Sequence, residues 1–286
     1  MTSRASGRVR WPGPEIDAKG VAEGGIVVGH VSKAYRGRSA TTAALDDVSI
    51  TVPRGKFVSV VGPSGCGKST LLRIVAGLSE PSQGNVMVNG ERPAVIASRK
   101  QIGFVPQSPA LLPWLSVLEN VSLPLALNRK ADVGRPARQR TPKEVLEALG
   151  LGAWLAARPG ELSGGMRQRV SLARAFALDP AVLLMDEPFS SLDEITREVL
   201  CEALLELWEA DRKTVLFVTH SLAEASVLSD EVVVLGGPPG RVVARIAVPL
   251  GRPRQASDHS ELVALQESLR LALRGGARLA DRSAER

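Results

Sequence analysis

A glycine-rich segment directly after an apolar run limits the possible folds of this chain more than any other feature. It fits the pattern G-x-x-x-x-G-K-[ST] and comprises Gly62, Pro63, Ser64, Gly65, Cys66, Gly67, Lys68, Ser69 and Thr70. The preceding residues 57–61 have the composition of a buried strand, and residues 69–76 predict a helix that ends at Gly77. Glycines let backbone N–H groups point towards a phosphate, and a helix N-terminus adds a positive dipole end. The sequence therefore predicts a phosphate-binding loop between a strand and a helix.

Two side chains of this loop suit a nucleoside triphosphate with magnesium. Lys68 is expected to reach the β- and γ-phosphates, and the Ser69 hydroxyl is expected to ligate Mg²⁺. The alternative is a glycine-rich turn with an exposed lysine. Cys66 lies inside the loop, where we expect an alkylating agent to block it.

A second apolar strand, residues 181–185, ends in two adjacent carboxylates, Asp186 and Glu187. Ligands of a parallel sheet bind at the carboxyl ends of its strands. At that edge Asp186 can enter the Mg²⁺ shell, and Glu187 can polarise a water for in-line attack on the γ-phosphate. The alternative is a pair of solvated turn acids before Pro188.

A serine and two glycines, Ser163, Gly164 and Gly165, open another predicted helix. Ser163 is a good N-cap, and the glycines leave backbone amides bare for an anion. A capped helix start without a ligand is the alternative, but it does not account for two poor helix formers at the helix mouth.

These segments, together with three further motifs, resemble the nucleotide-binding subunit of an ABC transporter. The resemblance covers about residues 26–248, and the motifs occur in the family's order. The further motifs are a Q-loop candidate with Gln107, a D-loop that ends in Asp193, and a switch histidine, His220. The combination is specific, whereas the phosphate loop alone would also admit kinases and GTPases.

The resemblance implies a role for each motif. Such subunits work as head-to-tail pairs with two ATP molecules between them, so residues 163–165 of one chain would clamp the ATP held by the phosphate loop of the other. His220 would hold the γ-phosphate and orient the water beside Glu187. Gln107 would take part in catalysis and would also be a ligand of Mg²⁺. Asp193 would contact the partner chain, and it can also cap the helix that follows.

Three other side chains have two interpretations each. Tyr35, the only tyrosine, matches the family's A-loop aromatic, which stacks on adenine; the alternative is a half-buried tyrosine at a strand end. Trp114 lies in the region that meets the membrane subunit in the family, and it is either an interface anchor or part of a helical core. Ser221 and Glu224 fit a capping box, so Glu224 is expected to be structural rather than catalytic.

Strand and helix alternate along most of the chain, which predicts an α/β fold with a largely parallel sheet. The resemblance makes this a P-loop NTPase (RecA-like) core with an antiparallel β edge and an inserted α-helical subdomain of about residues 108–165. We expect a disordered leader over residues 1–24, the ATP-binding domain over 25–250, and a C-terminal helix with a basic tail over 251–286.

The last segment is rich in arginine. Residues 258–274 predict an amphipathic helix, and Gly275-Gly276 is expected to interrupt it. Arginines recur there every four residues: Arg270, Arg274, Arg278, Arg282 and Arg286. A solvated basic tail is favoured, and a weak contact with lipid headgroups stays open.

Composition limits the classes of binding partner and the cellular compartment that are expected for this chain. Lys and Arg exceed Asp and Glu by 36 to 30, but aromatic residues are only 3% of the chain, which is too few for the stacking platforms of nucleic-acid binding. No run of 18 apolar residues is present, so the resemblance implies separate transmembrane permease subunits. Two cysteines and the lack of a secretory signal indicate a reducing compartment. The resemblance adds a peripheral position on the cytoplasmic face of the inner membrane as the expected location.

A finer resemblance indicates importers of nitrate, sulfonate or taurine. It depends on residues 110–114, 117–121, 186–197, 214–221 and 239–243. Importers of pyrimidine precursors or riboflavin use similar segments, and Ser190-Ser191 departs from the Gly-Ala of many members.

The implied cofactors are ATP and Mg²⁺. The implied partners are a second ATP-binding subunit, taken as a second copy of this chain, the permease and, indirectly, an extracytoplasmic solute-binding protein. Two remoter alternatives are a soluble ABC ATPase in DNA repair or translation and a P-loop kinase, against which residues 163–169 count.

Overall fold

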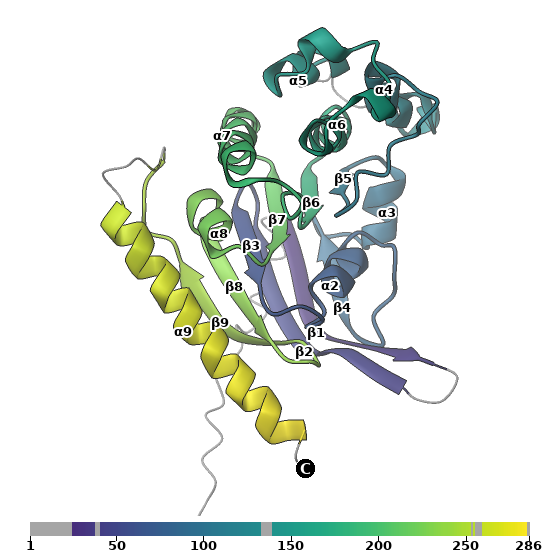
Figure 1. Cartoon of the computed structure of the whole chain (residues 1–286). Coiled ribbons are helices and arrows are strands. Elements are labelled where there is room, and N and C mark those ends of the chain that lie inside the picture. The colour runs from purple at the N-terminus through teal and green to yellow at the C-terminus, as the bar shows by residue number, and fades with distance from the viewer. Residues whose placement is uncertain (1–24, 38–40, 133–138, 253, 255–258, 285–286) are drawn as a thin grey trace, which may run out of the picture.

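Two β-sheets with helices packed around them form the structure (Figure 1). The computed structural model describes residues 25–37, 41–132, 139–252, 254 and 259–284, with residues 277–284 described by their backbone only. The leader predicted for residues 1–24 lies outside the described residues. Within the described ranges, no helix has the length and apolar character of a membrane span.

The larger sheet has six strands in the order β5-β6-β7-β3-β8-β9. Their bounds are β3 (Phe57–Val61), β5 (Ile102–Val105), β6 (Val182–Asp186), β7 (Thr214–Thr219), β8 (Glu231–Gly236) and β9 (Arg241–Ala247). The first five in the sheet are parallel, and β9 pairs antiparallel with β8 at the edge. Every residue of β3, β6 and β7 is buried, as expected for parallel strands covered on both faces. The predicted α/β core with an antiparallel edge is confirmed.

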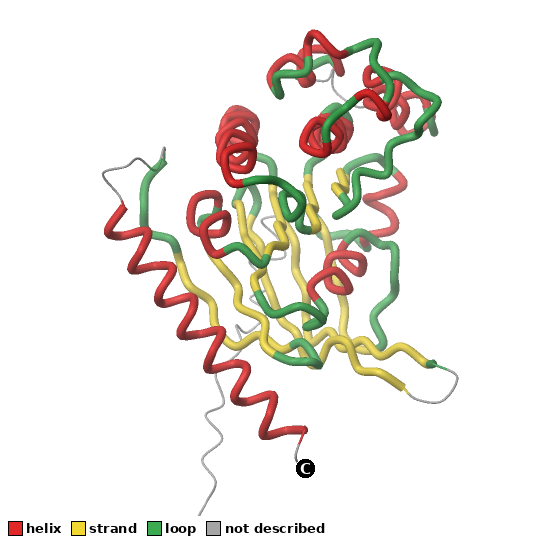
Figure 2. The backbone as a smooth tube through the Cα atoms, in the orientation of Figure 1, coloured by secondary structure: helices red, strands yellow, loops and turns green. Residues whose placement is uncertain are grey.

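Helices lie on both sides of these strands (Figure 2). They are α2 (Lys68–Val75), α3 (Pro93–Ser98), α4 (Val117–Ala126), α5 (Pro142–Ala148), α6 (Gly164–Phe176), α7 (Glu194–Asp211), α8 (Leu222–Leu228) and α9 (His259–Ala284). The expected helical insertion is present as α4 and α5, which pack on α6. The segment between α4 and α5 contains a short 3₁₀ turn, η1 (Arg129–Asp132), and residues 133–138 lie outside the described part. The helix α3 has no counterpart in the sequence prediction.

The central strands divide their side chains between two apolar cores. In β7, Val215 and Phe217 enter the core under α6 and α7, whereas Leu216 and Val218 enter the core around α2. Successive side chains of a strand point to opposite faces, so this alternation fixes the pairing register of the buried strands.

The smaller sheet is antiparallel, in the order β2-β1-β4. Its strands are β1 (Gly25–Arg36), β2 (Thr41–Pro53) and β4 (Gln83–Val88). The strand β1 continues well beyond Val28, because register shifts after that residue let it pair further along β2. Tyr35 therefore lies inside β1, opposite Thr42.

The C-terminal helix contradicts the sequence prediction. Gly275-Gly276 was expected to interrupt it, but α9 runs without a break to Ala284. A Cβ built at Gly276 would lie 3.1 Å from Val243 Cγ2 and 3.5 Å from the Cα of Gly236. The missing side chain thus lets α9 approach β8 and β9 closely, and this packing outweighs the low helix propensity of glycine.

Substitutions at the two glycines are expected to have opposite effects. Gly276→Leu should lower the free energy of unfolding by about 1–3 kcal/mol, because its side chain has no room beside Val243. Gly275→Ala should raise it by about 1 kcal/mol, because a Cβ there meets nothing within 4 Å and alanine favours the helix. Denaturant unfolding of both variants measures this difference. Equal effects at the two positions would contradict close packing at Gly276.

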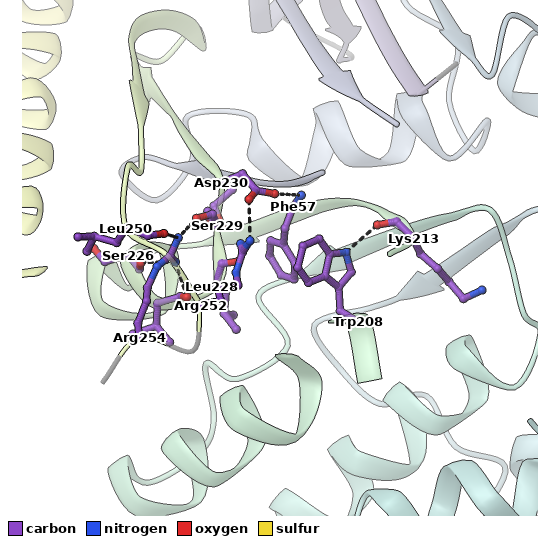
Figure 3. Close-up of polar contacts among 12 residues, drawn as sticks. Phe57, Trp208, Lys213, Ser226, Leu228, Ser229, Asp230, Leu250, Arg252 and Arg254 are labelled. Carbon is purple, nitrogen blue, oxygen red and sulfur yellow. Dashed lines mark hydrogen bonds and ion pairs between the residues drawn. The ribbon is translucent and has the colours of Figure 1, made fainter. Parts of the chain in front are cut away.

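Two arginines after β9 bind the carbonyl groups at the end of α8 (Figure 3). Arg252 donates to the carbonyl oxygen of Leu228 at 2.5 Å and to Asp230 Oδ1 at 2.6 Å, and its guanidinium lies 4.5 Å from the Trp208 ring. Arg254 donates to the carbonyl oxygens of Ser226, Val227, Ser229 and Leu250. A helix leaves its last carbonyls without an intrahelical partner, so these arginines complete the C-terminal end of α8.

Candidate active site

The glycine-rich loop joins β3 to α2 and encloses its lysine. Lys68 is only 5% exposed, and its Nζ donates to the carbonyl oxygens of Gly62 at 2.9 Å and Pro63 at 3.0 Å. Gly67 adopts φ 94°, and a Cβ there would lie 2.5 Å from the carbonyl oxygen of Ala44, so only glycine fits. The alternative of a turn with an exposed lysine is wrong.

The carboxyl ends of three neighbouring strands meet beside this loop. β3 pairs with β7 so that Val61 faces Thr219, and β6 pairs with β7 so that Asp186 faces Val218. This register brings the loop, the two acids after β6 and the histidine after β7 to one edge of the sheet, as the sequence predicts.

The first of the two acids contacts the loop. Ser69 Oγ donates to Asp186 Oδ1 at 2.9 Å. Burial raises the pKa of the Asp186 carboxyl, and the hydrogen bond from Ser69 acts in the opposite direction. A hydroxyl and a carboxylate side by side are oxygen ligands of the kind that Mg²⁺ prefers. In the described part of the chain no cluster of three or more His, Cys, Asp or Glu side chains could hold a metal, so such an ion would need further ligands from phosphate and water.

The second acid lies between Lys68 and His220. Glu187 Oε1 lies 3.7 Å from Lys68 Nζ, and Glu187 Oε2 lies 2.9 Å from His220 Nδ1. The backbone of Glu187 adopts φ 45°, in the left-handed region, and its N–H donates to the carbonyl oxygen of Val218. Strained backbone of this kind is concentrated at functional sites. Lys68, Glu187 and His220, predicted separately, therefore form one connected group.

The serine and glycines at the start of α6 form part of a different hollow. Ser163 Oγ accepts a hydrogen bond from the N–H of Met166 at 3.2 Å, which confirms the predicted N-cap. Residues 163–165 and Asp193 line a cavity of about 430 Å³, whose lining includes none of residues 62–70. Asp193 also caps α7, since its Oδ1 accepts from the N–H of Thr196 at 2.9 Å. One chain therefore carries two separate sets of predicted ATP-binding groups.

Known proteins resemble this chain in sequence. The model of the family described as ABC transporter matches residues 45–190. This chain belongs to the ABC transporter family. It is 40% identical over 235 residues to the aliphatic sulfonates import ATP-binding protein SsuB of Bacillus thuringiensis subsp. konkukian, with 82% of this chain and 90% of that protein covered. It is 46% identical over 222 residues to the taurine import ATP-binding protein TauB of Burkholderia pseudomallei, with 78% and 84% covered.

A solved ABC structure has the same fold and a hydrolysed nucleotide. The ATP-binding cassette MJ0796 superposes with a TM-score of 0.68 at 33% identity, covering 79% of this chain and all of that chain. That structure is a dimer in a post-hydrolysis state, bound to ADP and phosphate. The chain described here is accordingly an ABC ATPase that binds ATP.

Three predicted residues of this ABC ATPase lie on its surface. Tyr35 is 43% exposed near the end of β1, with Lys33 Nζ 5.1 Å from its ring centroid, so its exposure fits both a half-buried tyrosine at a strand end and a ring available for stacking. Gln107 is exposed just beyond β5. Trp114 is 65% exposed, which excludes the interpretation as part of a helical core.

The Cys66 thiol is not accessible to an alkylating agent, contrary to the sequence-based expectation. Its side chain is fully buried within the loop, and burial raises the pKa of its thiol. The thiolate is the reactive form, so both the lack of access and the raised pKa protect this cysteine.

Only one of the two hydrogen bonds of the predicted capping box forms between Ser221 and Glu224. Ser221 caps α8 as expected, because its Oγ accepts from the N–H of Glu224. The Glu224 carboxylate does not return to the backbone; it accepts from the Thr219 hydroxyl and pairs with Arg197. Sequence patterns could not reveal Arg197 as its partner, because that residue lies on another helix.

Proposed function

We propose that this ABC ATPase powers the uptake of an aliphatic sulfonate or of taurine through separate permease subunits. The names of relatives at 40% and 46% identity support this solute class over pyrimidine precursors, riboflavin or nitrate. The 33% identity to a cassette solved as a dimer supports a pair of subunits.

One observation carries the proposal for the reaction. The group around Lys68 and Glu187 and the hollow at residues 163–165 lie apart on the same chain. Two copies placed head to tail would bring the hollow of one against the phosphate loop of the other. Each ATP then lies between the copies, and Asp193 contacts the second copy.

Each predicted residue has a role on that nucleotide. Tyr35 stacks on the adenine, and residues 62–70 hold the phosphates with Lys68 at the β- and γ-phosphates. Glu187 takes a proton from the attacking water, and His220 holds the γ-phosphate beside it. Ser163, Gly164 and Gly165 of the second copy bind the γ-phosphate with bare N–H groups.

Magnesium fits the oxygen groups at the sheet edge. The Ser69–Asp186 contact of 2.9 Å joins two of the residues that would hold the ion, and Gln107 would be a third. The ion would neutralise charge on the phosphates.

Exposed Trp114 supports contact with a membrane partner. A large exposed aromatic side chain is typical of interface anchors. The ATPase would then sit peripherally on the cytoplasmic face of the inner membrane, and an extracytoplasmic solute-binding protein would deliver the solute to the permease.

A pull-down from native membranes tests this proposal. The Glu187→Gln chain, which is expected to stay bound to ATP, is captured with Mg-ATP, and the proteins retained with it are identified. We expect a polytopic permease, and the associated binding protein can then be screened against taurine and alkanesulfonates.

The same experiment can contradict transport. Recovery only with nucleic acid or ribosomes would replace transport by a role in DNA repair or translation. Binding of pyrimidine precursors or riboflavin, and not of sulfonates, by the associated binding protein would change the solute class alone.

A further inference from the structure

A continuous series of polar contacts joins the loop before α7 to the turn after β7. Arg197, one turn into α7, donates from Nη2 to the carbonyl oxygen of Leu192 at 2.7 Å. Its Nε lies 3.4 Å from Glu224 Oε1. Glu224 Oε2 accepts a hydrogen bond from the Thr219 hydroxyl at 2.5 Å. The helices α7 and α8, neighbours in Figure 1, are thus linked through charged groups.

The Thr219 hydroxyl also closes the backbone around His220. It accepts a hydrogen bond from the N–H of Ser221 at 3.0 Å while it donates to Glu224. His220 therefore lies between the residue that carries this hydroxyl, Thr219, and the residue whose N–H binds it, Ser221. A displacement of Glu224 would shift the turn that directs the imidazole towards Glu187, which is 2.9 Å from His220 Nδ1.

Burial keeps the two charged groups together. The Glu224 side chain is 5% exposed and that of Arg197 is 32% exposed. Burial raises the pKa of the Glu224 carboxyl, and the Thr219 hydroxyl and the Arg197 charge act in the opposite direction. A carboxylate buried to this degree is strongly destabilised without its cation. Separating Arg197 from Glu224 would therefore be unfavourable.

We propose that Arg197 and Glu224 are positioning residues that couple the loop before α7 to His220. The inference rests on the proposed function, in which His220 contacts the γ-phosphate and Asp193, next to Leu192, contacts the second copy. A second copy that displaces this loop then moves His220 through Arg197, Glu224 and Thr219. The imidazole reaches its working position only when the pair of subunits has closed.

The chain contains only three histidines, so NMR can test the contact directly. The imidazole resonances of His30, His220 and His259 are recorded for the unmodified chain, Arg197→Gln and Glu224→Gln, with His220→Gln for assignment. We expect the His220 signal to shift in both variants and the other two signals to stay. Glu206→Gln, which removes an exposed carboxylate from the same helix α7, should shift none of them.

Kinetics tests whether the contact serves the reaction. Each single variant should lower kcat about tenfold and leave the dissociation constant for ATP within about twofold. The double variant should be no slower than the slower single variant, because both changes break one link. Arg197→Lys should restore part of the lost kcat, since it keeps the positive charge, and Glu206→Gln should leave kcat unchanged.

Several results would overturn the proposal. One is a His220 signal that stays in place in both variants. A second is a shifted His220 signal in a variant whose kcat is normal. A third is a double variant whose kcat loss equals the two single losses combined. A fourth is a kcat loss that is fully explained by the fraction of unfolded protein. Failure of the proposed function would give a different set of results. The His220→Ala variant would then keep its kcat. The His220 NMR signal would still shift in Arg197→Gln and Glu224→Gln, which retain this histidine.

Discussion

Glu187→Gln is expected to lower kcat for ATP hydrolysis by about 10²–10⁴ while the protein still binds ATP. The carboxylate lies 3.7 Å from Lys68 Nζ and 2.9 Å from His220 Nδ1, so it is held at the point where the three strand ends meet. Glutamine has nearly the same shape but cannot accept a proton from water. Removing one negative charge beside Lys68 also reduces repulsion of the triphosphate.

Steady-state phosphate release and equilibrium ATP binding, measured on the same preparation, check this prediction. Glu91→Gln is a matched control, because Glu91 pairs with Arg99 on the surface. That variant should keep both its turnover and its affinity. Unchanged turnover in Glu187→Gln would exclude Glu187 as the general base.

Lys68→Ala is expected to raise the dissociation constant for ATP by about 10²-fold or more, which corresponds to about 3 kcal/mol. Nζ donates to the carbonyl oxygens of Gly62 and Pro63, so the ammonium group lies inside the loop. Charge-assisted hydrogen bonds to phosphate are among the strong ones, at about 1.5–3 kcal/mol each. Alanine removes all of these contacts.

Calorimetric ATP titration measures the affinity, and thermal unfolding shows whether the loop variant is folded. Lys68→Met keeps most of the side-chain volume and should bind ATP as weakly as Lys68→Ala. Lys56→Ala removes an exposed lysine before the opposite end of β3 and should bind ATP normally. Normal affinity in Lys68→Met would contradict a phosphate contact by this lysine.

The core strands and their loops could be predicted because their patterns are contiguous. Residues 57–61 are all buried in β3, and Gly65 and Gly67 of the following loop adopt left-handed backbone. Once the strands are parallel, their carboxyl ends lie at one edge, so Lys68, Glu187 and His220 had to be near one another.

Features that depend on distant segments could not be predicted. Whether α9 passes through Gly275-Gly276 is decided by the close approach of Gly276 to Val243 on β9. The partner of Glu224 is decided by the packing of α7 against α8, and a capping-box pattern carries no information about that packing. Local propensity gives way in both places to tertiary contact.

The position of β3 in the sheet has a consequence for synthesis of the chain. This strand leads into the phosphate loop, yet both of its neighbours, β7 (Thr214–Thr219) and β8 (Glu231–Gly236), come from the last third of the sequence. Chains leave the ribosome from the N-terminus, and pairings between distant segments form late. The phosphate loop is thus made early but acquires its neighbours only when the chain is nearly complete, so a growing chain has no assembled site with which to consume ATP.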